Sequence, residues 1–108
     1  MDDVATTFAS LLGQFAGNPR VAEGKWFGKT CANVDGKAFL VLFGGDVAFK
    51  LDEGARSKAL QIEGAQLFDP RGQGKAFKEW VQVPSRRSGE WPQLAASAYA
   101  FVSVGAAV

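Results

Sequence analysis

The sequence contains no histidine and a single cysteine, Cys31. Without histidine the chain cannot assemble a Ser-His-Asp or Cys-His nucleophile, and it cannot build a histidine-containing zinc site. One thiol allows neither an internal disulfide nor a four-thiolate zinc site, so a disulfide-stapled secreted scaffold is excluded. We therefore expect a protein of a reducing, cytosolic setting that carries no cofactor or metal.

The chain also lacks a strong net charge and a long apolar run. Twelve Lys and Arg against eleven Asp and Glu give a net charge of +1, so no global field attracts nucleic acid. The opening residues, MDDVATTFASLL, carry two acids where a secretory signal needs a positive charge. Residues 91–108 are uncharged but include Pro92, and 18 residues fall short of the roughly 20 apolar residues of a membrane span. We expect a buried helix there, no membrane contact and a cytoplasmic location.

What the sequence does have is apolar bulk. Hydrophobic residues make up 47 % of the 108 residues and include nine Phe and three Trp. A chain of this length suits one domain with one core, and these side chains supply enough buried area to fold it without staples. We expect a single domain over residues 1–108.

Periodicity and turn signals predict an α+β fold in the order αβββαββα, an antiparallel sheet of about five strands with N-terminal, middle and C-terminal helices packed on it. The Asp35-Gly36 pair predicts a tight hairpin, and Pro84 ends the last strand. The expected elements are a helix from Asp2 or Asp3 to about Phe15, strands at Lys25–Val34, Lys37–Phe43 and Val47–Leu51, a helix capped by Asp52 and ended by Gly64, a short strand in AQLF, a strand at Lys75–Val83, a polar loop in SRRSGE and a helix from about Pro92.

The strands between Trp26 and Leu51 are interpreted first as the wall of a core. The expected buried residues are Phe39, Val41, Phe43, Val47 and Phe49. Cys31 lies in the middle of a strand and is interpreted as an inert core thiol. Lys29 nearby is the one feature that could lower its pKa.

Basic residues on the strands and an adjoining loop are the candidate contact residues. They are Lys29, Lys50 and Lys78 on strands, with Arg86 and Arg87 on the loop after Pro84. Alternation places Trp80 on the same face as Lys78. If these side chains converge, they form a basic-aromatic surface suited to phosphate or single-stranded nucleic acid. The structural alternative is that outward lysines keep the sheet soluble and discourage edge pairing.

Three blocks in order resemble the TfoX N-terminal domain family. They are Trp26-Phe27-Gly28, Val34-Asp35-Gly36-Lys37-Ala38-Phe39 and Ala48-Phe49-Lys50-Leu51-Asp52. Phe68, the run Trp80-Val81-Gln82-Val83-Pro84 and the closing alanine-rich helix look like the same family and its relative, the YjbR group. The resemblance spans about Phe8 to Val102. It implies a stand-alone, cytoplasmic member of a bacterial family named after a competence regulator, and it carries no catalytic residue over to this chain.

Together these observations lead to an expectation about function. We expect a small regulatory or protein-interaction domain without catalysis, whose partner is another protein or a second copy of the chain. One alternative is a nucleic-acid binder that uses Lys29, Lys50, Lys78, Arg86 and Arg87 around Trp80. Another is a small enzyme with a lysine or carboxylate in a pocket between sheet and helix.

Overall fold

The computed structural model describes residues 4–26, 28–69, 74 and 77–106. The α+β class predicted from the sequence is confirmed, with helices near the beginning, in the middle and near the end of the chain. The elements are α1 (Val4–Gly13), β1 (Val21–Trp26), β2 (Lys29–Val34), β3 (Lys37–Phe43), β4 (Asp46–Lys50), α2 (Glu53–Ala59), β5 (Gln66–Phe68), β6 (Phe77–Val83), the 3-10 helix η1 (Ser85–Glu90) and α3 (Trp91–Ala106).

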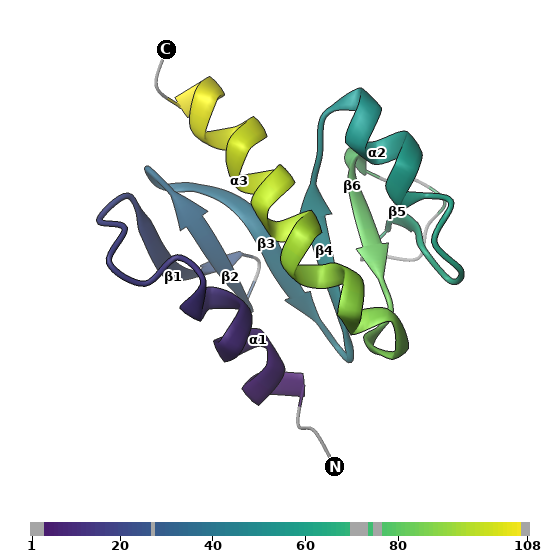
Figure 1. Ribbon diagram of the computed structural model, residues 1–108, viewed down its shortest axis with the longest axis horizontal. Helices are drawn as coiled ribbons and strands as arrows, with labels where there is room; N and C mark the ends of the chain where they lie inside the picture. The colour runs from purple at the N-terminus through teal and green to yellow at the C-terminus, as the bar shows by residue number, and fades with distance from the viewer. Residues whose placement is uncertain (1–3, 27, 70–73, 75–76, 107–108) are drawn as a thin grey trace.

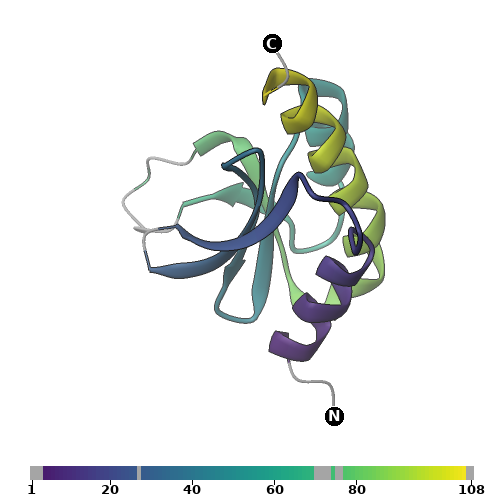
Figure 2. The same ribbon diagram turned by 90° about the vertical axis from the view of Figure 1, so that its left-hand side faces the viewer.

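The strands form one antiparallel sheet in the order β1-β2-β3-β4-β6-β5. Helix α3 crosses the middle of one face, and α1 and α2 lie to either side of it (Figure 1). Seen from the side, the sheet curls away from these helices (Figure 2). The molecule therefore has a helix side and a concave side, and alternate residues of each strand point to one or the other.

The sheet has six strands where about five are expected, because the predicted strand at Lys25–Val34 is interrupted. Trp26 on β1 pairs with Lys29 on β2, so the chain reverses between these two residues. Gly28 has φ +79°, a conformation that glycine adopts without a steric penalty. Residues 21–24, for which no strand is predicted, form the rest of β1. The single long strand was wrong because two residues suffice for a hairpin, and Phe27 itself lies outside the described residues.

The predicted hairpin at Asp35-Gly36 is present and is tied to the helix side. Asp35 and Gly36 have φ of 52° and 82°, as a tight turn between antiparallel strands requires. The Arg20 guanidinium donates through Nε to Asp35 Oδ2 at 2.9 Å and through Nη2 to the Ser103 carbonyl at 3.1 Å. One side chain thus joins the β2–β3 turn to the end of α3. Its hydrogen bond lowers the pKa of the Asp35 carboxyl.

A β-bulge lies at Phe39 in the apolar run AFLVLF, whose side chains pack on both faces of the sheet. Ala32 pairs with Leu40 and Asn33 pairs with Ala38, which leaves Phe39 without a partner on β2. The extra residue shifts the alternation, so Phe39 and Leu40 both join the helix-side core while Val41 lies on the concave side. The central strand therefore serves two apolar clusters.

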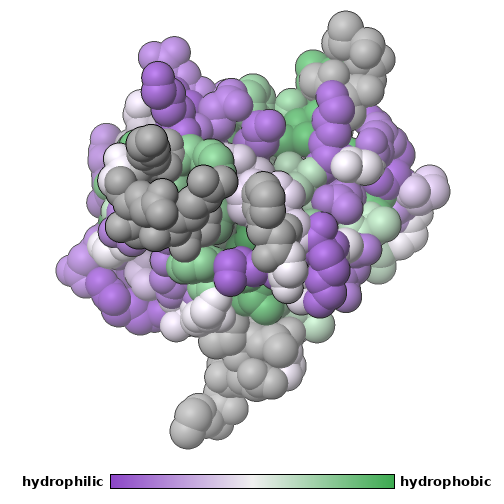
Figure 3. Space-filling view, turned by 180° about the vertical axis from the view of Figure 1, so that it is seen from behind, coloured by the Kyte–Doolittle hydropathy of each residue, from purple (hydrophilic) through white to green (hydrophobic). Residues whose placement is uncertain are grey.

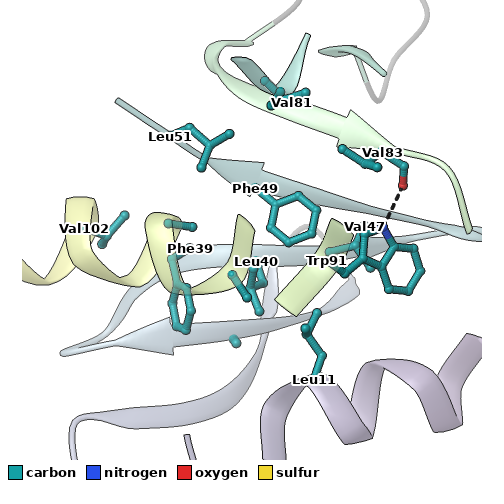
Figure 4. Close-up of a cluster of buried hydrophobic side chains, with 14 of the residues drawn as sticks. Leu11, Phe39, Leu40, Val47, Phe49, Leu51, Val81, Val83, Trp91 and Val102 are labelled. Carbon is teal, nitrogen blue, oxygen red and sulfur yellow. Dashed lines mark hydrogen bonds between the residues drawn. The ribbon is translucent and has the colours of Figure 1, made fainter. Parts of the chain in front are cut away.

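The helix-side core contains most of the buried apolar residues (Figure 4). Of the five residues expected to be buried, Phe39, Val41, Val47 and Phe49 are 0 % exposed, while Phe43 is half-buried. Trp91 at the start of α3 is buried and donates from Nε1 to the Val83 carbonyl at 3.3 Å. The larger members of the core are Phe8, Leu11, Val34, Phe39, Leu40, Val47, Phe49, Leu51, Val81, Val83, Trp91 and Val102.

The connections follow the sequence signals with two exceptions, of which one is that α2 ends at Ala59 and not at Gly64. Asp52 caps α2 as predicted, since its Oδ1 accepts from the Ala55 backbone N–H at 2.8 Å. The expected polar loop at residues 85–90 is instead the 3-10 helix η1, because Pro84 in extended conformation leads directly into helical turns. Asp2, Asp3 and the first two residues of the strand expected at Lys75–Val83 lie outside the described residues. In the part of the chain that the structure describes, no helix is long and apolar enough to span a membrane.

Truncating Phe39 tests the placement of the bulge. The ring is fully buried and makes edge contacts with Phe15 at 5.3 Å and Tyr99 at 5.8 Å between centroids. Phe39→Ala should lower the free energy of unfolding by about 3–5 kcal/mol in urea titrations. Val104→Ala, at a side chain that is 67 % exposed, is the control and should change little. A loss below about 1 kcal/mol for Phe39→Ala would contradict the burial of this ring.

The Arg20–Asp35 pair predicts an acid-sensitive part of the stability. Because the folded pKa of Asp35 is lowered, its contribution is present above the unfolded pKa of about 3.9 and is lost as pH falls through the lower folded value. Asp35→Asn keeps a residue that tolerates positive φ but removes the charge. The variant should be less stable than wild type at neutral pH and match it at the acid end. Thermal melts from pH 2 to 7 would disagree if the gap between the two proteins did not change with pH.

Candidate functional site

The concave side carries a second, smaller apolar cluster that we call the aromatic face. Its rings are partly accessible, since Trp26, Phe43 and Phe77 are half-buried while Phe68 and Trp80 are buried. Apolar surface is visible between polar side chains when the molecule is seen from this side (Figure 3). The aromatic face comprises the rings of Trp26, Phe43, Phe68, Phe77 and Trp80 over a floor of Cys31, Ala38, Val41 and Ala48.

Contacts of Trp26 join the two ends of the sheet. Trp26 lies on the edge strand β1, and Trp80 lies on β6, with β2, β3 and β4 between them. Their rings nevertheless stack, with centroids 5.5 Å apart and planes inclined by 26°. Trp26 also contacts Phe77 at 5.6 Å and Phe68 at 5.9 Å. These contacts require the sheet to curl as Figure 2 shows, and each aromatic pair adds to the stability of the curl.

Small residues on the floor allow this curvature. Gly24 on β1 pairs with Cys31 on β2, and a Cβ at Gly24 would lie 2.6 Å from Asn33 Nδ2. A larger residue at Gly24 would therefore displace Asn33, whose Oδ1 lies 3.4 Å from Cys31 Sγ. Ala48 on β4 continues the row of short side chains. The rings at the strand ends can then lean over the middle of the sheet.

A second irregularity brings two rings of β6 onto the same face. Leu67 pairs with Val81, but the next residue, Phe68, pairs with Phe77, so β6 contains extra residues at this point. Phe77 and Trp80 are three apart and both contact the aromatic face, which strict alternation does not allow. The Lys78 side chain is exposed, and the expectation that it shares a face with Trp80 stays a prediction.

Two of the five predicted basic residues border the aromatic face. Lys29 is half-buried, and its Nζ lies 4.7 Å from the centroid of the Phe43 ring, a cation–π arrangement. Lys50 on β4 pairs in register with Trp80 and follows the alternation of Ala48 to the concave side. Its Nζ is 4.0 Å from Glu79 Oε1, a distance that gives a weak, partly exposed ion pair.

The two predicted arginines lie elsewhere. Arg86 and Arg87 are on η1, and each is beside a carboxylate: Arg86 Nε is 3.9 Å from Glu63 Oε1, and Arg87 Nη2 is 3.8 Å from Glu90 Oε2. Arg86 also covers Gly64, where a Cβ would approach its guanidinium to 2.5 Å. The structure thus brings Lys29, Lys50 and Trp80 to the aromatic face, while Arg86 lies beside the turn after α2 and Arg87 pairs with Glu90 within η1.

Cys31 lies in the floor of the aromatic face and is 1 % exposed. Burial raises the pKa of its thiol, so the charged thiolate is disfavoured. The sequence-based possibility that Lys29 lowers this pKa is wrong, because removal from water outweighs the nearby charges. The residue behaves as a small apolar side chain.

The arrangement is suited to binding by stacking and apolar contact. Half-buried rings can be covered further by a partner, and two lysines and one glutamate at the border can fix its orientation. Sequence reasoning found Trp80 and the two lysines, and alternation along β3 places Phe43 beside Val41. It missed Phe68 and Phe77, because only the irregular pairing of β5 with β6 brings both rings here.

Thiol reactivity tests whether the aromatic face opens by itself. Cys31 should react slowly with a disulfide reagent such as DTNB in the native protein, since its thiol is buried and its pKa is raised. Trp26→Ala removes the ring that joins β1 to β6 and should accelerate the reaction by about tenfold or more. Leu12→Ala trims a half-buried side chain on the helix side and should leave the rate almost unchanged. Equal acceleration in both variants would mean that Cys31 reacts only after global unfolding.

The described residues contain no group of three Cys, Asp or Glu side chains placed to hold a metal ion. Comparison of the chain with protein families, curated proteins and solved structures gave no match. The resemblance to the TfoX N-terminal domain family therefore stays a prediction, and a functional proposal has to start from the side chains of the aromatic face.

Proposed function

We propose that this chain is a small, non-catalytic interaction domain that binds a protein partner through the aromatic face. One observation carries the proposal: the Trp26 ring stacks on Trp80 across the sheet and yet remains half-exposed, on the side that the α-helices leave uncovered. Tryptophan is the residue type most enriched among those that dominate protein–protein binding energy.

Packing alone accounts for only part of the aromatic face. Phe68 and Trp80 are buried and need no further explanation. Trp26, Phe43 and Phe77 still present apolar area to water. Covering that area is favourable by about 25 cal/mol for each Å² removed from water, and neighbouring rings on a curved surface offer a continuous target. A partner with an apolar segment gains most by lying along these three rings.

The charges at the border favour a protein over a strongly charged polymer. Lys50 is balanced by Glu79, and Lys29 is held over Phe43. The net charge of the chain is +1. An apolar centre with a mixed polar rim is the usual composition of a protein interface. The partner is another protein or a second copy of this chain.

The sequence resemblance supports a regulatory setting for this interaction. The blocks around Trp26, Asp35 and Phe49 resemble the TfoX N-terminal domain family, whose name comes from a bacterial competence regulator. We accordingly propose a cytoplasmic, regulatory protein of bacterial origin that acts by contact and without turnover of a substrate.

Single-stranded nucleic acid is the second candidate ligand, and the position of Lys29 favours it. A cation over the Phe43 ring and a second lysine beside Trp80 combine stacking surfaces with phosphate-binding charge. Against it, the η1 residues Arg86 and Arg87 each lie beside a carboxylate, of Glu63 and Glu90 respectively. Lys78 lies in the part of β6 whose pairing with β5 is irregular. Fewer cations would then contact phosphate than the sequence suggests.

The three indole N–H signals of the ¹⁵N-labelled protein distinguish these proposals. Trp26 and Trp80 report on the aromatic face, and Trp91, bonded to the Val83 carbonyl, is an internal reference on the helix side. Spectra recorded over a series of protein concentrations detect self-association. A partner protein that co-purifies with the tagged chain is purified separately and titrated into the labelled chain. Binding by the proposed mode should shift the first two signals and spare the third, and Trp26→Ser should weaken it by about tenfold or more.

Two results would decide against a protein partner at this surface. One is a partner that binds Trp26→Ser as tightly as wild type. The other is micromolar binding of labelled single-stranded DNA whose affinity falls steeply between 50 and 200 mM salt. A protein that contacts many phosphates loses about 10³-fold in affinity over this range. The second result, combined with shifts of the Trp26 and Trp80 signals, would show that the aromatic face binds nucleic acid.

A further inference from the structure

A cleft lies between α2 and α3, on the helix side of the sheet and thus opposite the aromatic face. Its volume is about 410 Å³, within the range of small-molecule sites. Ala55, Ala59 and Ile62 line it at helical spacing from α2 and the turn after it, and Leu94 faces them from α3. Ala59 is buried and the other three are half-buried, so the cleft has an apolar wall on both sides.

The cleft exists because small side chains line α2. Gly54, Ala55 and Ala59 occupy the positions where leucine or isoleucine would fill the space between two packed helices. The gap is therefore a consequence of residue size, and its walls keep apolar area that a ligand can cover.

Three charged side chains line the cleft, and two of them already have partners. Asp52 Oδ1 accepts the Ala55 N–H at the start of α2, and Glu90 lies 3.8 Å from Arg87. In the described part of the chain, the Lys58 ammonium makes no ion pair or hydrogen bond. Gln93 and Ser97 add an amide and a hydroxyl to the same cleft. Asp52 and Glu90 keep their charges. Among the described residues, Lys58 is the charged lining side chain without a protein partner, so it is the group that can pair with a ligand anion.

We propose that this cleft binds a small monocarboxylate with an apolar chain. The chain lies along Ala59, Ile62 and Leu94, where it replaces water against apolar walls. The carboxylate pairs with Lys58, and the amide of Gln93 and the hydroxyl of Ser97 lie within the same cleft as further donors. This site is independent of the proposed protein contact, since the two surfaces are on opposite faces of the sheet.

Octanoate is the probe, titrated into the ¹⁵N-labelled chain, with octylamine and octanol as matched ligands of the same length. Octanoate should shift amide signals of α2 and the first turns of α3 and bind more tightly than either analogue. Lys58→Gln should weaken octanoate binding about fivefold to tenfold and leave octanol unaffected, as a charge-assisted contact at an exposed side chain predicts. Lys78→Gln, at an exposed lysine on β6, is the control and should bind as wild type does.

A second variant keeps the test decisive if the charge effect is small. Ala55→Leu fills the cleft from a half-buried position and should abolish the shifts for octanoate and octanol while the protein stays folded. Shifts that appear instead at Trp26 and Trp80, or equal binding of octanoate and octylamine, would overturn the proposal. Trp26→Ser should bind octanoate normally, so failure at the aromatic face and failure at the cleft are read separately.

Discussion

The stacking of Trp26 on Trp80 is the contact on which the shape of the sheet depends. It joins β1 to β6 across three intervening strands, although β1 and β6 are not hydrogen-bonded neighbours in the sheet. Because the two rings meet above the floor, the apolar side chains of the concave side form a second cluster. The same contact leaves Trp26 at the border of that cluster, where it still meets water. One interaction therefore links the curvature of the sheet to the surface that stays accessible.

Sequence periodicity predicted the class, the helices and the Asp35-Gly36 hairpin, because these depend on neighbours along the chain. It could not separate β1 from β2, since a two-residue reversal at Gly28 leaves no break in composition. The bulge at Phe39 shows a second limit. A run of six apolar residues is compatible with a regular central strand, and only the pairing with β2 reveals that one residue is extra.

The candidate site was predictable to the extent that it lies on regular strands. Lys29 and Lys50 follow the alternation of their strands and reach the concave side together with Trp80. Arg86 and Arg87 do not, because residues after Pro84 turn into η1 and meet Glu63 and Glu90. Charge along a sequence says nothing of which carboxylate a flexible side chain will meet. Whether basic side chains gather on one surface thus depends on the geometry of the turns that carry them, here the turn after Pro84.

Small residues shape both of the proposed binding surfaces. On the concave side Gly24, Cys31 and Ala48 keep the floor low, so that large rings lean inward from the strand ends. On the helix side the short side chains of Ala55 and Ala59 leave the space between α2 and α3 unfilled, which is the cleft. Beneath the cleft the core is complete, since Phe49 and Val81 under the helices are fully buried. The space left over is therefore outside the part of the structure that folding requires, and a ligand can occupy it without disturbing the core.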